Sequence, residues 1–263
     1  MSMIFQIDLA ILKQLVRLKF TNVRQVLFDK FINFYIWAGV TMFVSGYLLQ
    51  AFGLVDDFGV FQLGGILACV GLFELYGNAV TFVSDLECDR TIAYYLTLPT
   101  HTATVLCSHI FYYATIGTVM SIATLPLAKL ILWNKLSLLA IAWPSLLFFI
   151  VLINIFCATA TLLLSAFVPS MDKFDILWTR IIFPLWVLGG FQFSWHSVHS
   201  TAPKLSYILL LNPITYMSEG VRAALLGQNC ALPYWICCAV LSGMFIGVAI
   251  WSFKALKKRL DFV

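Results

Sequence analysis

Charged residues that could take part in chemistry are few in this sequence. One carboxylate, Glu74, stands inside a long apolar run, and Asp85, Glu87, Asp89 and Arg90 follow directly after that run. A charge within an apolar segment must face protein or water, so Glu74 is a candidate for a path or a gate. The acidic residues Asp85, Glu87 and Asp89 have no histidine beside them, which argues against acid–base catalysis. They are candidates for the recognition of a partner instead.

Metal and nucleotide motifs give a negative prediction. His196 and His199 could touch one metal ion or haem, but no third ligand lies nearby, and a solvated outer loop is the preferred interpretation. The seven cysteines contain no C-x-x-C, which predicts neither a disulfide framework nor a zinc site. No glycine is followed by lysine, so the loop G-x-x-x-x-G-K-[ST] is absent. We expect no metal, no cofactor and no nucleotide site in this chain.

The composition indicates the class of protein. Of the 263 residues, 62% are hydrophobic and 11% are charged, and the mean hydropathy is +0.95. An ordinary soluble domain has about 45–50% apolar and about 25% charged residues. A globule of this size could not hide so much apolar surface from water, which excludes a soluble enzyme. We therefore expect an all-α integral membrane protein.

Six apolar runs are expected to cross the bilayer as helices. They are residues 31–53, 59–83, 102–128, 136–167, 174–193 and 231–253. Pro144 bends the fourth run or marks its start. At about 20 residues per crossing, six crossings and their connections use nearly the whole chain. Residues 1–263 are thus expected to form one transmembrane domain.

Residues 1–30 carry an apolar stripe of helical period, flanked by Lys13, Arg17 and Arg24. This pattern is typical of an amphipathic helix that lies in the membrane interface with its basic residues toward lipid headgroups. Twelve lysines and arginines fall on the side of both termini and four on the other side. The positive-inside rule therefore predicts that both termini are cytoplasmic.

Residues 84–100 form a polar segment between the second and third runs. Ser84 and Glu87 make a capping box, so we expect a helix to begin at Ser84, and Pro99 favours its end near residue 98. This helix is too short and too polar to span. It is either a simple surface helix on the cytoplasmic side or a lever pushed by a soluble partner.

Residues 194–230 are expected to face the outside. Asn212 is a good N-cap, Pro213 suits the first helical position, and Gly227 is placed to end the helix. At 1.5 Å per residue this helix spans about 21 Å, so we expect it to dip into the outer leaflet or lie along it. Glu219 and Arg222 are three residues apart and can pair on one face.

The order and spacing of these parts resemble the permease subunit of an ABC-2 type transporter. The resemblance rests on the amphipathic N-terminal helix, the six spans, D-R-T-x-x-x-x-L-x-x-P at residues 89–99 and N-P-I-T-Y-x-x-E-x-x-R at residues 212–222. It covers nearly the whole chain. It implies that residues 84–100 form a coupling helix, which docks into a groove on a separate ATPase subunit.

The resemblance also assigns roles to individual residues. The implied docking residues are Glu87, Asp89, Arg90, Thr91 and Tyr94, assisted by the N-terminal helix. The segment before the last span would form re-entrant helices that cap the exit of the path. Candidates for the pathway or its gate are Glu74, Asn212, Pro213, Tyr216, Glu219 and Arg222. For Glu74, a structural carboxylate bonded to a partner at a helix break is an equal alternative.

These features predict a transport subunit in the bacterial cytoplasmic (inner) membrane. Two copies of an ABC ATPase would bind Mg-ATP and drive a dimer of permeases, by default a homodimer. The cargo would be a lipid-linked glycan, a lipid or a hydrophobic small molecule, and export is favoured because the outer loops offer no receptor platform. The alternatives are an integral membrane transferase or an ion-coupled secondary carrier, which would need more intramembrane charges.

Overall fold

The computed structural model describes residues 8–21, 23–53, 58–97, 99–227 and 232–260, and this part of the chain is helical without β-strands. Its helices are α1 (Leu9–Thr21), α2 (Val23–Phe43), α3 (Phe58–Ser84), α4 (Thr91–Thr97), α5 (Thr102–Ile131), α6 (Trp143–Phe167), α7 (Phe174–Leu177), α8 (Phe183–Leu188), α9 (Trp195–Thr201), α10 (Pro203–Leu209), α11 (Pro213–Leu226) and α12 (Tyr234–Leu260). Short turns of π- or 3-10 helix extend α2 to Phe52, extend α3 to Asp89 and join α7 to α8.

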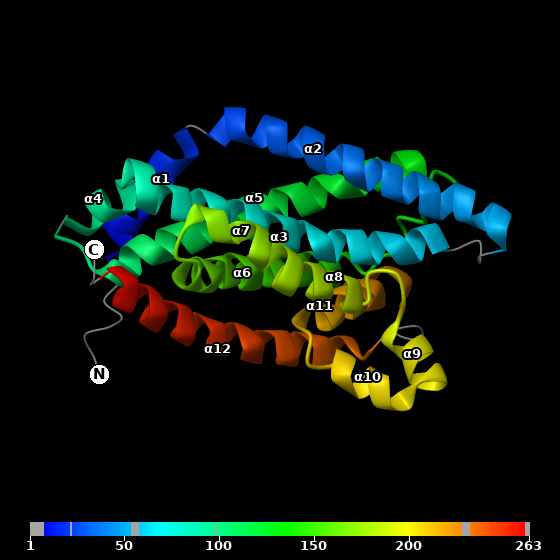
Figure 1. Ribbon diagram of the computed structural model, residues 1–263. Helices are drawn as coiled ribbons and strands as arrows, with labels where there is room; N and C mark the ends of the chain where they lie inside the picture. The colour runs from blue at the N-terminus through cyan, green and yellow to red at the C-terminus, as the bar shows by residue number, and fades with distance from the viewer. Residues whose placement is uncertain (1–7, 22, 54–57, 98, 228–231, 261–263) are drawn as a thin grey trace.

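The long helices run side by side between two ends of the molecule (Figure 1). We call the end that carries α1, α4 and the last turns of α12 the inner end, and the end that carries α9 and α10 the outer end, after the sidedness predicted from the sequence. Among the described residues, five stretches are long and apolar enough to cross a membrane: Leu27–Phe52, Phe58–Asp89, Thr102–Ile131, Trp143–Phe167 and Tyr234–Leu260. This arrangement is that of a multi-pass membrane protein.

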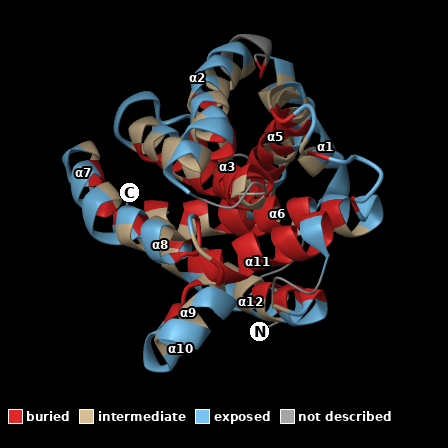
Figure 2. Cartoon of the chain, turned by 90° about the vertical axis from the view of Figure 1, so that its right-hand side faces the viewer, coloured by how far each residue is buried: buried red, intermediate tan, exposed pale blue. Residues whose placement is uncertain are grey.

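The central helix is α3. In its most apolar stretch, 83% of the residues are buried, against 28% in the span that contains α2 and 22% in α12. Seen end-on, buried residues gather on α3, α6 and α11, whereas the outward faces of α2, α8 and α12 are exposed (Figure 2). Lipid tails are as apolar as leucine, so exposed apolar faces on the outside of this bundle suit a bilayer.

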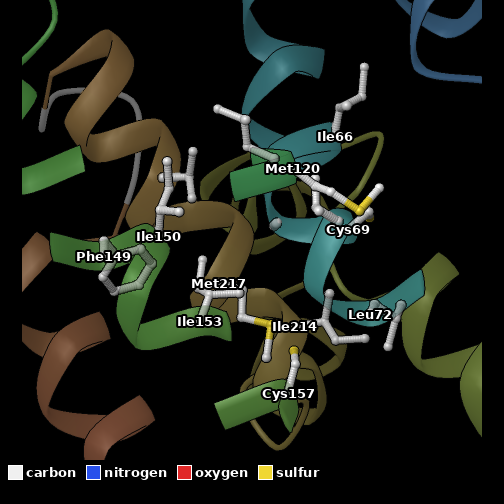
Figure 3. Close-up of a cluster of buried hydrophobic side chains, with 14 of the residues drawn as sticks. Ile66, Cys69, Leu72, Met120, Phe149, Ile150, Ile153, Cys157, Ile214 and Met217 are labelled. Carbon is white, nitrogen blue, oxygen red and sulfur yellow. The ribbon is translucent and has the colours of Figure 1, made fainter. Parts of the chain in front are cut away.

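The core brings together helices that are far apart in the sequence. Figure 3 shows Cys69 of α3, Met120 of α5, Ile153 of α6 and Met217 of α11 in one buried cluster. The short helix α11 therefore belongs to the core, although it was expected only to dip into or lie along the membrane. Its buried position fixes where its charged residues must lie.

The six predicted spans are only partly matched. The expected fifth span, residues 174–193, is a shorter broken helix from Phe174 to Leu188, about 22 Å long at 1.5 Å per residue. That length is less than the bilayer core of about 30 Å. The helix stops because Gly189 and Gly190 follow, and Gly190 has a positive φ of 75° that turns the chain. The crossing of this segment stays a prediction.

Two other boundaries differ from expectation. The fourth span begins at Trp143 and not at residue 136, because Pro144 occupies the first turn of α6, where its missing N–H costs nothing. The last helix continues past residue 253 to Leu260 and has three basic residues in its final turn. Basic side chains stabilise a helix C-terminus, and Arg259 donates to the carbonyl oxygen of Val168 at 2.7 Å.

The amphipathic segment expected over residues 1–30 is divided between two helices. α1 ends at Thr21, and α2 begins at Val23 and runs on into the first long span. The two helices meet at an angle (Figure 1). The apolar residues near the end of the predicted stripe continue into the span, so Lys30 lies on a helix of the bundle.

Gly65 is predicted to be essential for the packing of α3. A Cβ at this position would lie 2.7 Å from the carbonyl oxygen of Phe191, and we expect Gly65→Ala to cost about 1–3 kcal/mol. A Cβ at Gly77 of the same helix meets nothing within 4 Å. Gly77→Ala should be neutral or stabilising by up to about 1 kcal/mol. Reversible unfolding in mixed micelles measures both, and equal effects would contradict the packing.

Candidate functional site

The predicted coupling segment at the inner end has a different start from the one expected. Ser84 has helical backbone angles and makes no capping bond, because α3 continues through the π-helical turn that follows. The cap of α4 is Asp85, whose carboxylate accepts the backbone N–H of Thr91 at 3.3 Å and of Ile92 at 2.8 Å. A carboxylate suits this place because the free N–H groups of a helix start carry partial positive charge.

The five predicted docking residues lie together at the exposed inner end. They are Glu87, Asp89, Arg90, Thr91 and Tyr94, and all five are exposed. Arg90 has a φ of 52°, which turns the chain between the end of α3 and α4. Glu87 accepts a hydrogen bond from the N–H of Met171, in the loop before α7, at 3.4 Å. We call these five residues the inner surface.

The inner surface is mounted on the bundle by apolar contacts. Ile92 of α4 is buried in a cluster with Phe82 of α3, Leu106 of α5, Leu162 of α6 and Leu256 of α12. Buried side chains in such a cluster are close-packed and transmit strain. Through Ile92, α4 is thus part of a buried cluster to which four long helices contribute.

Lys19 connects α1 to this region and was not predicted to do so. Its Nζ lies 2.7 Å from Nε2 of His109 on α5 and 5.9 Å from the ring centroid of Tyr95 on α4. Burial lowers the pKa of Lys19 to about 7, and the negative charge of Asp85 opposes this shift. α1 is thus held against α4 and α5 by a partly desolvated ammonium group.

The other basic residues of the predicted interfacial helix differ from Lys19. Lys13 and Arg17 are exposed on α1, as a helix in contact with headgroups requires. Arg24 lies in α2, and its side chain is outside the described part of the structure. Lys13 and Arg17 are four residues apart and share one exposed face of α1, whereas Lys19 contacts α5.

Glu74 forms a salt bridge with a lysine on a neighbouring helix. Nζ of Lys30 on α2 lies 2.6 Å from Oε2 of Glu74 and 3.0 Å from Oδ1 of Asn78. The side chains of Lys30 and Glu74 are only 26% and 11% exposed. The pairing explains how α3 accommodates a carboxylate in an apolar environment.

An aromatic groove opens beside this ion pair. It has a volume of about 360 Å³, lies between α2 and α3, and is lined by Phe34, Trp37 and Phe73 together with Lys30 and Glu74. Ring contacts continue from the groove to α8, where Trp186 lies 5.9 Å from Phe73 and 6.4 Å from Trp37 between ring centroids. We call this cavity the aromatic groove.

At the outer end, Arg222 is wholly buried. Its Nη1 donates to Oε1 of Glu219 and to the carbonyl oxygen of Phe193, at 3.1 and 3.0 Å. Its Nη2 donates to the carbonyl of Phe191 at 3.1 Å, and its Nε to that of Phe61 at 3.3 Å. The guanidinium also lies 3.7 Å from the ring centroid of Phe61. Arg222 therefore joins α11 to α3 and to the turn after α8.

Glu219 extends these connections to two further segments. Its Oε1 also accepts the N–H of Trp195 at the start of α9, and its Oε2 accepts the N–H of Leu232 before α12, each at 3.1 Å. We call Glu219, Arg222 and the backbone groups they bond the outer clamp. The predicted pairing of the two side chains is confirmed, with an Nη1–Oε1 distance of 3.1 Å.

The remaining pathway candidates have mostly structural contacts. Asn212 caps α11 through Oδ1, which accepts the N–H of Ile214 at 3.0 Å, and its Nδ2 donates to the carbonyl of Leu185 at 2.7 Å. Pro213 occupies the first turn of α11, as predicted. Tyr216 is buried. Of the six candidates, only Glu74 lies in the aromatic groove, and a pathway role for the others stays a prediction.

The two outer histidines lie on a helix, where a loop was expected. His196 and His199 belong to α9, which is capped by Ser194. The ring of His199 stacks on Trp195 at 4.7 Å and its Nδ1 lies 2.8 Å from Oγ of Ser206. Within the described ranges, no group of three or more His, Cys, Asp or Glu side chains could hold a metal ion.

Comparison with known families identifies the chain. The family model of the ABC-2 type transporter matches residues 9–226, which is most of the sequence. The chain belongs to this family, and it is the transmembrane component of an ABC-type transporter. No individual curated protein matched it.

The outer clamp yields a stability prediction. Arg222→Gln leaves the Glu219 carboxylate buried without its charge partner, which should cost about 3–5 kcal/mol. The double variant with Glu219→Gln should be less destabilised than the sum of the two single variants, because the two side chains interact directly. Unfolding in mixed micelles measures the free energy of unfolding of the natural chain, the two single variants and the double variant. The exposed outer-end residue Lys204, changed to Gln, is the control, and simple additivity would contradict the clamp.

Proposed function

We propose that this chain is the permease of an ATP-driven exporter, and that a separate ATPase subunit binds its inner surface. The observation that carries the proposal is the combination of exposure and rigid mounting at Glu87, Asp89, Arg90, Thr91 and Tyr94. The five side chains are available to a soluble partner, whereas the apolar side of α4 contacts the core. ATP hydrolysis belongs to the partner, since the sequence has no nucleotide-binding loop of its own.

The mechanism follows from what α4 contacts. ATP binding closes the ATPase dimer and pushes residues 84–100. The push passes to α3 first, because the segment before α4 is a direct continuation of that helix. α3 then moves against α2 and against residues 174–188. Rings from these two segments contact the aromatic residues of the aromatic groove. This movement opens a path toward the outer end.

The full transporter contains two ATPase copies and two permeases, with a homodimer as the default. Each chain supplies a single transmembrane permease domain with six crossings, and the segment before α12 caps the exit. Both termini face the cytoplasm of a bacterial cell, because most lysines and arginines lie at the inner end. The cargo is a lipid-linked glycan, a lipid or a hydrophobic small molecule.

The docking assignment is tested by reversing charge on the inner surface. The triple variant Glu87→Lys, Asp89→Lys and Arg90→Glu should reduce co-purification of the ATPase at least about tenfold, which corresponds to the loss of about 1.4 kcal/mol of binding free energy. The bundle should keep its thermal stability, because these side chains are exposed. Co-purification from membranes and thermal unfolding are the two measurements.

The matched control is charge reversal at the outer end, Lys204→Glu, which should leave ATPase binding unchanged. If the triple variant still co-purifies with the ATPase and transports normally, the ATPase docks elsewhere. A membrane transferase would be revealed by product formation from the purified chain without any ATPase.

Glu74 is predicted to couple ATP hydrolysis to transport. Glu74→Gln removes the charge partner of Lys30 at the wall of the aromatic groove, and should lower cargo-stimulated ATP hydrolysis by about tenfold if the lost interaction is about 1.4 kcal/mol. The double variant with Lys30→Gln should recover part of the rate, because no unpaired charge remains. An unchanged rate in Glu74→Gln would assign this residue to structure alone.

A further inference from the structure

A second cavity lies at the inner end, between α1, α3, α4 and α5. Its volume is about 260 Å³, and its polar lining includes Lys19, Lys30, Thr81, Tyr95 and Tyr112. Drug-sized ligands occupy pockets of about 300–1,000 Å³, so this cavity fits a headgroup and not a whole molecule. We call it the headgroup cavity.

Within the described residues, Lys19 is the cation of the headgroup cavity that has no carboxylate in direct contact. Asp85 also lines it, but both carboxylate oxygens accept N–H groups of α4. Glu74 is engaged by Lys30 and Asn78. Lys19 forms no ion pair in the described part of the chain, and its ammonium lies against the ring nitrogen of His109. A desolvated ammonium without a carboxylate partner favours binding of an external anion.

Lys30 belongs to both cavities, since it lines the headgroup cavity and the aromatic groove. On α2 the groove is lined by Lys30, Phe34 and Trp37, and α2 runs away from the inner end in this direction (Figure 1). The wall of the groove is largely aromatic, which suits an apolar body, whereas the headgroup cavity supplies ammonium and hydroxyl donors. A ligand that fits both has a compact anionic head joined to an apolar body.

We propose that the headgroup cavity binds the phosphate of an amphiphile whose apolar part lies in the aromatic groove. Phosphate oxygens accept hydrogen bonds from Lys19, from Lys30 and from tyrosine hydroxyls, as charge-assisted bonds. The Lys30 ammonium has three N–H donors, of which Glu74 and Asn78 accept two, so the phosphate accepts the third and the ion pair between α2 and α3 is kept. This inference rests on the proposed transport function and specifies the head chemistry of its cargo.

The test uses the full chain purified in a maltoside detergent, which contains no phosphate. The probes are phosphatidylglycerol, a diacylglycerol with the same acyl chains, and inorganic phosphate. Phosphatidylglycerol should bind at least about tenfold tighter than diacylglycerol, and Lys19→Gln should remove about tenfold of that affinity, as expected for one charge-assisted bond. Lys19→Arg keeps the charge and should retain binding.

A matched control separates this site from general surface charge. Lys257 is exposed on α12 at the same end of the molecule, outside the cavity, and Lys257→Gln should leave the affinity unchanged. Equal losses in Lys19→Gln and Lys257→Gln would overturn the proposal. Equal binding of phosphatidylglycerol and diacylglycerol would also overturn it. Binding of inorganic phosphate as tight as that of the lipid would show a soluble phosphate ligand and no amphiphile.

The pH dependence gives a second readout that does not need Lys19→Gln to fold. The titratable groups around Lys19 are His109, Tyr95 and Asp85, and the same cavity is lined by Lys30, which pairs with Glu74, and by Tyr112 and Tyr113. Since the pKa of Lys19 is about 7, the empty site loses its ammonium charge as pH rises, and a phosphodiester does not titrate in this range. Affinity should therefore be weaker at pH 8 than at pH 6 in the natural chain. It should be nearly constant in Lys19→Arg, which keeps every other group; the same fall in both would overturn the proposal.

Failure of this inference can be told apart from failure of the proposed function. The lipid measurements need neither ATPase nor nucleotide. If the ATPase co-purifies with the natural chain but phosphatidylglycerol is not preferred, only the headgroup assignment is wrong. If no ATPase associates, the proposed function is wrong, whatever the lipid binding.

Discussion

A guanidinium group buried among apolar helices must be surrounded by acceptors, and this requirement organises the outer half of the protein. Arg222 finds its acceptors on Glu219 and on three backbone carbonyls from α3 and the turn after α8. The approach is possible only because α3 has glycines there, since a Cβ at Gly64 would lie 2.6 Å from Cγ of Arg222. Removing a polar partner from such an arrangement leaves a desolvated charge, which costs more than the bond contributes.

The same constraint has a different solution at the inner end. Charges there are exposed, as on the inner surface, or paired across helices, as Lys30 is with Glu74, whereas the half-buried Lys19 contacts the ring nitrogen of His109. The pair is partly accessible to solvent, whereas the two side chains of the outer clamp are buried. The charged pair at the outer end is therefore closed to solvent, whereas the pair at the inner end is partly open to it. Helix α3 contributes a residue to each, Phe61 at the outer end and Glu74 at the inner end.

Much of this architecture could be predicted from the sequence because it depends on local patterns. Apolar runs locate the long helices, and Asn212, Pro213 and Gly227 mark the limits of α11 by capping chemistry. Local patterns failed where a neighbouring element decided the outcome. The capping box at Ser84 was inactive because α3 continued through it, and Asp85 capped α4 from across a turn.

The partners of the charged residues were harder to predict. The pairing of Glu219 with Arg222 follows from helical spacing, but the carbonyl acceptors of Arg222 could not be found, because every residue has a carbonyl. Lys30 could not be assigned to Glu74, because the sequence pattern placed Lys30 at the end of the amphipathic segment and outside the first predicted span. The contact between Lys19 and His109 could not be predicted either, since α1 precedes the first span and its packing on α5 depends on the whole fold.

The outer clamp also sets an order for biosynthesis. It joins Phe61, near the start of the second long helix, to Leu232, just before the last one. A nascent chain that has not yet been translated to residue 232 cannot satisfy both oxygens of Glu219. Since an incompletely bonded charge is expensive in hydrocarbon, α11 should remain at the membrane surface until α12 emerges from the ribosome, and then enter the bundle last.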